Sequence, residues 1–363
     1  MSVHIKLYEK LAKPIFFKID PEVTHDLMTN VGAVLGSNAV TRLLTSLFFN
    51  YKNKKLNINI KGIEFPNPVG LAAGFDKNGK LTDLMPHAGF GFEEIGSITA
   101  LPCKGNPRPR LFRLPKDNAI IVNYGLCNDG VEKVVERIKN KRFRIPIGVS
   151  IAKTNDPNIK GDDSVDDYYK SFYFAKHIGS YITINISCPN TGDGRSFEDP
   201  ILLEKLLKKI GKTNKIIFLK LSPDLPKERL DKIIKLSEKY SISGFILTNL
   251  THDRSKLKTS KMELEDKKGG ISGWAVREKS LDMLKYVYKK TKGKFVIISV
   301  GGIFSAEDAY ERIKNGASLV QLITGMIYKG PALIKHINTG LVKLLERDGY
   351  NNIREAIGAD VRT

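Results

Sequence analysis

Short apolar runs alternate with amphipathic segments along most of this chain. The runs are rich in Ile, Val, Leu and Phe, and several of the intervening segments repeat apolar residues at helical spacing. Strands that are apolar on both faces are typical of a parallel sheet covered by helices. The predicted strands are 68–73, 91–97, 147–151, 181–186, 216–221, 244–248, 295–300 and 318–324, and the clearest predicted helices are 200–210, 227–240, 275–290 and 305–315.

Eight strands with helical crossovers favour a closed barrel. Eight is the number that closes a (β/α)8 TIM barrel, and the segment has a suitable length. A doubly wound open sheet is the alternative, and it usually carries a Gly-rich dinucleotide turn after its first strand. That turn here reads Ala72-Ala73-Gly74-Phe75-Asp76-Lys77. We therefore expect an α/β chain with a TIM barrel.

The segment before the first predicted strand has a different character. Residues 3–17 and 23–49 look like two or more helices broken by Pro14 and Pro21, with too many apolar residues for a solvated arm. Such helices could form a cap packed on the barrel, or an amphipathic anchor at a lipid surface. In the second case Lys6, Lys10, Lys13 and Lys18 would meet lipid head groups. We expect an N-terminal helical extension over 1–58, the barrel over 59–345 and a C-terminal tail over 346–363.

Composition excludes several classes of function. The 363 residues carry a formal charge of +20, but acidic residues are interleaved with the lysines, and no Arg-rich cluster indicates nucleic-acid binding. The three cysteines form no CxxC pair, so neither a disulfide framework nor a metal site is expected. No signal peptide and no apolar run of membrane-spanning length is visible. We expect the protein in the cytoplasm or peripherally on the cytoplasmic side of a membrane.

Glycines after the last two predicted strands indicate a phosphate site. The seventh strand ends in Gly301-Gly302 and the eighth in Thr324-Gly325. Backbone N–H groups can approach a phosphate closely where no Cβ intervenes, and barrels often bind phosphate at this position. A sugar phosphate, a flavin mononucleotide and a nucleotide all fit this pattern, and simple turn glycines are the alternative.

A thiol and several carboxamides follow other predicted strands. Cys188 comes directly after the fourth strand, and no histidine lies within ten residues of it, which favours a general acid or base over an acyl-forming nucleophile. An inert buried thiol is the alternative. Asn185, Asn190 and Asn249 together suit a ligand with alternating C=O and N–H edges, such as a pyrimidine, although each alone could be a turn former.

Two lysines lie at strand ends. Lys220 interrupts an apolar strand, and because an unpartnered buried charge is costly, we expect it to face a bound anion or an electron-rich ring. Lys77 follows the first strand and could be either a ligand-binding group or an ordinary exposed loop lysine.

These motifs together resemble the dihydroorotate dehydrogenase family in order and spacing. The resemblance runs from about residue 8 to 335, and the segment 17–25 resembles the N-terminal arm of the membrane-associated, quinone-using class 2 enzymes. The segments that carry it are 70–79, 94–97, 107–113, 185–191, Lys220, Thr248-Asn249, 269–273 and 300–302.

The resemblance implies oxidation of dihydroorotate to orotate in pyrimidine biosynthesis, with flavin mononucleotide (FMN) as hydride acceptor. Cys188 would be the base, and Lys77, Asn123, Asn185, Asn190 and Asn249 would hold the substrate. FMN would be held by Ala73, Gly74, Ser97, Ser150, Asn185, Lys220, Thr248, Gly273, Gly302, Thr324 and Gly325. Quinone would reoxidise the flavin, with peripheral membrane contact and no nucleic acid.

The chain departs from the class 2 pattern on the substrate side. Class 2 enzymes typically carry Ser as the base, whereas Cys188 is the class 1 residue, and that residue would fit fumarate or a partner-borne flavin as acceptor better. In the substrate loop Val122 stands where Asn is usual, and Asn123 replaces that contact only if the loop shifts. Ser150 and Leu250 stand where class 2 usually has Asn and Thr. Alternatives are therefore an FMN oxidoreductase of the same scaffold acting on a related dihydropyrimidine or another cyclic substrate, or a non-catalytic membrane-surface binding module.

Overall fold

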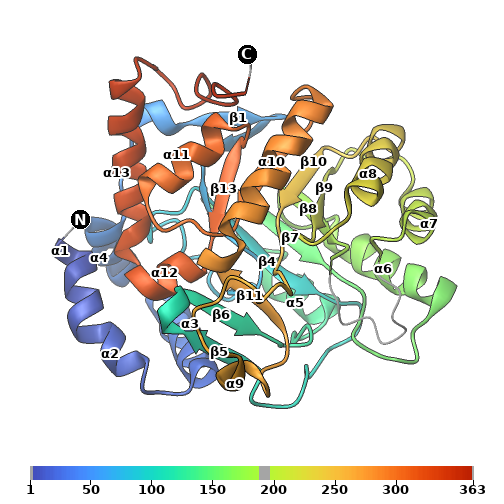
Figure 1. Ribbon diagram of the computed structural model, residues 1–363, viewed down its shortest axis with the longest axis horizontal. Coiled ribbons are helices and arrows are strands. Elements are labelled where there is room, and N and C mark those ends of the chain that lie inside the picture. Colours follow the sequence, from blue (N-terminus) through green and yellow to red (C-terminus); the bar gives the residue numbers. More distant parts are fainter. Residues whose placement is uncertain (1–2, 188–196, 362–363) are drawn as a thin grey trace.

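Eight parallel strands close into a barrel in the computed structural model, which describes residues 3–187 and 197–361 (Figure 1). Each of the eight predicted strands is present, so the TIM barrel is confirmed and the open sheet is excluded. Around the barrel the strands are β3 (Val69–Leu71), β4 (Phe92–Ile98), β7 (Ile147–Ile151), β8 (Tyr181–Asn185), β9 (Ile216–Leu221), β10 (Gly244–Leu247), β12 (Val296–Val300) and β13 (Leu319–Leu322).

Helices cover the outside of the barrel, and the four clearest predicted helices are confirmed. In α7 (Pro200–Ile210), Leu203, Leu206 and Leu207 form the buried stripe, while the carboxylate of Asp199 accepts from the Ile201 N–H at 2.8 Å and caps the first turn. The other covering helices are α5 (Val131–Ile138), α6 (Gly161–Ala175), α8 (Lys227–Lys239), α10 (Arg277–Thr291), α11 (Ala306–Lys314), α12 (Thr324–Lys329) and α13 (Ala332–Arg347).

The N-terminal arm is helical and packs against one side of the barrel, beside α12 and α13 (Figure 1). The break expected at Pro14 is absent. A π-helix over Tyr8–Ala12 leads directly into α2 (Lys13–Phe16), so Pro14 lies within a continuous helical run, in which the Lys13 N–H donates to the Tyr8 carbonyl five residues back. Pro21 begins a helix as expected, with Asp20 as its cap. The arm consists of α1 (Val3–Leu7), this π-helix, α2, α3 (Pro21–Ser37) and α4 (Ala39–Phe49).

The arm has features of both alternatives considered from the sequence, a cap packed on the barrel and an anchor at a lipid surface. It is tied to the barrel, because the Tyr8 hydroxyl donates to the Ile327 carbonyl at 2.8 Å and Lys329 pairs with Glu9 at 2.7 Å. It also leaves large apolar side chains exposed on its outer face. No single helix in the described part of the chain is long and apolar enough to cross a membrane, whereas α3 and α4 taken together pass that test with a bend of 112°.

Two small antiparallel sheets were not predicted from the sequence. The strands β1 (Ile58–Ile60) and β2 (Ile63–Phe65) form a hairpin ahead of the barrel. The strands β5 (Leu111–Leu114), β6 (Ala119–Val122) and β11 (Gly270–Gly273) form a sheet in the order β11-β6-β5. Residues of this second sheet line the main cavity, so it completes the site that the barrel begins.

Candidate active site

One cavity of about 720 Å³ joins the C-terminal ends of the barrel strands to the arm. Its barrel side is polar, with residues at or just after the C-terminal ends of β3, β4, β8, β9 and β10. Its other side is apolar and lies among the arm helices. Predicted site residues that line this cavity are Ala73, Gly74, Lys77, Ser97, Asn123, Asn185, Lys220, Asn249 and Thr324; its arm-side wall includes Phe17, Met28, Val31, Leu35 and Phe49.

A chain of amides and hydroxyls crosses the polar end of the cavity. The Asn249 amide donates to the Ser187 hydroxyl at 2.8 Å, and that hydroxyl donates to Asn185 Oδ1 at 3.0 Å. The Asn185 amide donates in turn to Ser97 Oγ at 2.9 Å, which lies 2.7 Å from Ser150 Oγ. Residues from four different strand ends therefore hold one another in place and present a row of donors and acceptors to a ligand.

Lys77 lies in the cavity wall, half-buried, and is not an ordinary exposed loop lysine. Its ammonium sits over the Tyr124 ring, 3.8 Å from the centroid. Burial lowers the pKa of Lys77 to about 8, and the carboxylates of Asp26 and Glu22 oppose that shift only in part. The group is a cation at neutral pH that can receive an anion from the cavity.

Lys220 is buried at the centre of the barrel, on β9 beside Asn185 of β8. Burial lowers the pKa of Lys220, and the nearby Glu94 carboxyl partly opposes this shift. Burial raises the pKa of Glu94, whose Oε2 accepts from Thr183 at 3.0 Å and Gln321 at 3.2 Å. Lys220 thus lines the cavity, and its electrostatic partner Glu94 is held in place by hydrogen bonds.

A second, smaller cavity of about 70 Å³ adjoins the first and has a glycine floor. Gly302 has φ +70°, and a Cβ there would lie 2.4 Å from Arg277 Cβ; Gly273 has φ +99°, and a Cβ there would lie 2.4 Å from the Asn118 carbonyl oxygen. Only glycine fits at such positions, which leaves backbone N–H groups open to a ligand. Gly301, Gly302, Thr324 and Gly325 of the predicted phosphate site line it, together with Thr248 and Gly273 from the set that the resemblance assigns to FMN.

Comparisons with known proteins agree with this geometry. A family model described as dihydroorotate dehydrogenase matches residues 55–345. The chain belongs to the dihydroorotate dehydrogenase family. It is 38% identical over 375 residues to dihydroorotate dehydrogenase (quinone) of Trichodesmium erythraeum, covering 98% of this chain and 99% of that protein.

Other members of the dihydroorotate dehydrogenase family match over similar lengths. The quinone enzyme of Natronomonas pharaonis is 38% identical, with 98% of this chain and 99% of that protein covered. The ligand-free crystal structure of the enzyme from Eimeria tenella superposes with a TM-score of 0.81 at 31% identity, covering 95% of this chain and all of that one. The family resemblance read from the motifs is therefore confirmed.

The structure locates most residues that the dihydroorotate dehydrogenase resemblance selected. All of them within the described ranges line one of the two cavities except Ser150, which contacts the cavity residue Ser97. Cys188 and Asn190 lie outside the described residues. Within those residues, no group of three or more His, Cys, Asp or Glu side chains is placed to hold a metal ion.

The loop after β6, which the resemblance assigned to the substrate, departs from the usual family motif. β6 ends at Val122, and the chain leaves the sheet there, so Val122 and Asn123 both line the cavity. The Asn123 side chain is already hydrogen-bonded within the protein, because its Oδ1 accepts from the Asn106 amide at 2.9 Å. Leu250 adds a second apolar group to the same cavity.

Sequence reasoning missed three residues of the site. Ser187 bridges Asn185 and Asn249, and its position between Asn185 and Cys188 was the available signal. Tyr124 lies against Lys77, and Glu94 interacts electrostatically with Lys220. The signal for Glu94 was a charge within the predicted apolar strand 91–97, whereas Tyr124 had no local signal for its contact with Lys77.

Proposed function

We propose that this chain oxidises dihydroorotate to orotate, with FMN as cofactor and quinone as electron acceptor. The observation that carries the proposal is the single cavity that joins a polar, cationic end at the barrel to an apolar end among the arm helices. A polar substrate and an apolar acceptor could each reach a flavin from one end of this cavity.

The barrel residues fit FMN. The small cavity with its glycine floor suits a phosphate, and the Thr324 and Ser272 hydroxyls, 2.9 Å apart, border it. Lys220 and the Asn185–Ser97 pair would border the flavin ring. When bound there, FMN would supply the hydride acceptor for the oxidation.

The substrate would bind above the amide chain. Lys77 would pair with its carboxylate, while Asn185 and Asn249 would bind ring C=O and N–H groups, with Asn190 and Asn123 as further contacts. Cys188 Sγ would take the C5 proton. A free thiol has a pKa near ~8.5, so it becomes a base more readily than an alcohol would.

The arm would contact the membrane and admit quinone. Leu43, Leu44, Leu47 and Phe48 of α4 are all exposed, which is unusual for one face of a short helix unless something apolar covers it. The lysines of α1 and α2 add positive charge for anionic head groups. We propose peripheral association on the cytoplasmic side of a membrane.

Stopped-flow spectroscopy separates the two half-reactions and tests the proposal. Purified protein should be yellow, and dihydroorotate should bleach its flavin absorbance. The reduced enzyme should then be reoxidised rapidly by a short-chain quinone, and slowly by fumarate or NAD in parallel. Colourless protein would contradict the proposal and favour a non-catalytic binding module.

A second candidate has specific support from the cavity wall. Val122 and Leu250 replace polar groups on the substrate side, so a related dihydropyrimidine with fewer polar contacts is the alternative substrate. Flavin that binds but is reduced much faster by such a compound than by dihydroorotate would favour this alternative.

A further inference from the structure

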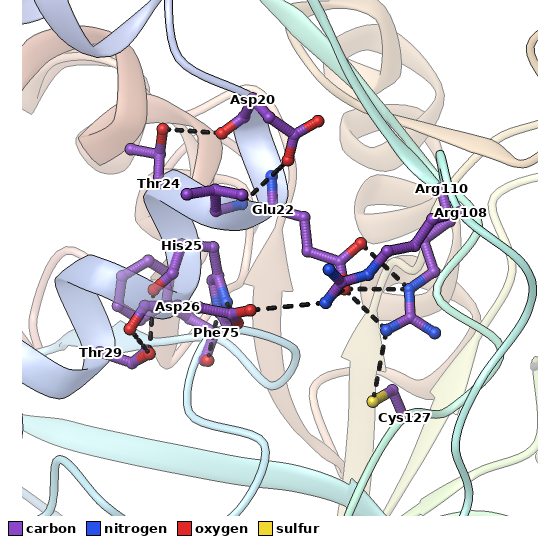
Figure 2. A network of polar contacts seen from close by, with 11 residues as sticks. Asp20, Glu22, Thr24, His25, Asp26, Thr29, Phe75, Arg108, Arg110 and Cys127 are labelled. Carbon is purple, nitrogen blue, oxygen red and sulfur yellow. Dashed lines mark hydrogen bonds and ion pairs between the residues drawn. The ribbon is translucent and has the colours of Figure 1, made fainter.

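A buried ion pair connects the arm to the loop that precedes β5 (Figure 2). Glu22, in the first turn of α3, is 4% exposed, and Arg110 is 6% exposed. Arg110 Nη2 lies 2.6 Å from Glu22 Oε1, and Arg110 Nε lies 3.1 and 3.2 Å from the two carboxylate oxygens. This two-pronged geometry fixes the guanidinium plane as well as its position.

The other contacts of Arg110 reach the loop between β4 and β5 and the loop after β6. Nη1 donates to the Lys104 carbonyl at 2.8 Å and to the Asn106 carbonyl at 2.9 Å, and Nη2 donates to Cys127 Sγ at 3.6 Å. The arm carboxylate therefore orients a guanidinium whose other side holds the backbone at residues 104–106.

Asn106 connects this loop to the cavity wall through hydrogen bonds to two residues that line the cavity, Asn123 and Tyr124. Its amide donates to the Asn123 carbonyl at 3.0 Å and to Asn123 Oδ1 at 2.9 Å, and its backbone N–H donates to the Tyr124 carbonyl at 3.0 Å. Tyr124 is the residue whose ring lies under the Lys77 ammonium, and Arg110 lies 5.2 Å from the same ring. Asn123 and Tyr124, which would face the substrate, are thus connected to Glu22 through Asn106 and Arg110.

We propose that Glu22 and Arg110 are positioning residues for the substrate half-reaction. The arm then has a second role besides quinone access, because its first α3 turn holds Asn123 and Tyr124 in place. The inference rests on the proposed function for its kinetic consequence, although the structural coupling can be measured without any substrate.

The test compares Glu22→Gln with Glu9→Gln. Both substitutions remove the carboxylate of an ion pair between arm and barrel, but Glu9 pairs with Lys329 of α12 and does not contact the substrate loop. In Glu22→Gln we expect a KM for dihydroorotate higher by roughly tenfold, within the ~10²-fold that misplacing a group by about 1 Å can cost. FMN content, and reoxidation of dithionite-reduced flavin by quinone, should match wild type. Glu9→Gln should leave the KM unchanged.

Hydrogen exchange tests the coupling independently of the reaction. The backbone amides of Asn106 and Asn123 donate to the Tyr124 and Arg110 carbonyls, so both should exchange faster in Glu22→Gln than in Glu9→Gln. Unchanged exchange would overturn the inference even if dihydroorotate proves not to be the substrate. If wild type is reduced by dihydroorotate and Glu22→Gln has the same KM, the inference fails while the proposed function stands.

A second variant covers the case in which Glu22→Gln does not fold, since an unpaired buried charge is strongly destabilising. Asn106→Ala removes the side-chain hydrogen bonds from Asn106 to Asn123 and leaves the Glu22–Arg110 ion pair in place. It should raise the KM and accelerate Asn123 exchange in the same way. Wild-type values for both would contradict the role assigned to the network.

Discussion

The ammonium group of Lys77 lies 3.8 Å from the centroid of the Tyr124 ring, across the cavity wall from the amides of Asn185 and Asn249. A ring face attracts a cation without neutralising it, so the charge remains available to an anionic ligand. Burial lowers the Lys77 pKa to about 8, which places its titration close to physiological pH.

Substrate affinity should therefore fall as pH rises through about 8 to 9. Lys77 is charged below its pKa and neutral above it, so the KM for dihydroorotate should increase across this interval. Lys77→Arg keeps the charge at every accessible pH and should show a flatter KM profile. Steady-state KM from pH 6.5 to 9.5 checks this, and an identical rise in the Arg variant would assign the effect to another group.

Loss of the Cys188 thiol should affect the chemical step alone. Cys188→Ala should retain FMN but slow flavin reduction by dihydroorotate by roughly 10²–10⁴-fold, the usual contribution of a positioned general base. Single-turnover absorbance at the flavin band measures this rate. Near-wild-type reduction would show that Cys188 is not the base, whereas quinone reoxidation should be unchanged in any case.

A methyl group at Gly302 should weaken FMN binding. The added Cβ would meet Arg277 Cβ at 2.4 Å and would also sit at φ +70°, where a side chain costs about 1–2 kcal/mol. Gly349→Ala is the matched control, because its φ of +77° carries the same backbone strain while nothing lies within 4 Å of the new atom. Flavin fluorescence titration should show a higher Kd for Gly302→Ala only; equal affinity in both variants would exclude Gly302 from the phosphate site.

Charges on α4 should release the protein from membranes. Leu43 and Leu47 are 61% and 65% exposed and lie one helical turn apart. Burying each leucine is worth about 1.5 kcal/mol or more, so replacing both with Asp should weaken vesicle binding by at least ~10²-fold.

The control for that experiment is Ile201→Asp on α7, where a 73% exposed apolar residue lies far from the arm (Figure 1). Cosedimentation with vesicles containing anionic lipid measures binding. Flavin reduction by dihydroorotate should match wild type in all variants. Equal binding of the double variant and wild type would place the membrane contact elsewhere.

The barrel strands could be predicted because each is buried on both faces, which makes its sequence continuously apolar. All five residues of β7 are buried, for example, and the run 147–151 was predicted with the observed bounds. The sheet of β5, β6 and β11 escaped prediction because its strands are four residues each, and β11 contains two glycines. β11 is stabilised by its antiparallel pairing with β6, which lies far away in the sequence, whereas β5 and β6 are close neighbours along the chain.

The sequence by itself determined the barrel and the family and selected candidate site residues, because strand ends and glycine turns are local patterns with fixed spacing. Only the tertiary structure decided how those residues act on one another. It buried Lys77 against Tyr124, brought Glu94 within electrostatic reach of Lys220, and joined Glu22 to Arg110 across 88 positions of chain. Burial and Coulomb interactions depend on distance in space, so neither can be read from the order of residues along the chain.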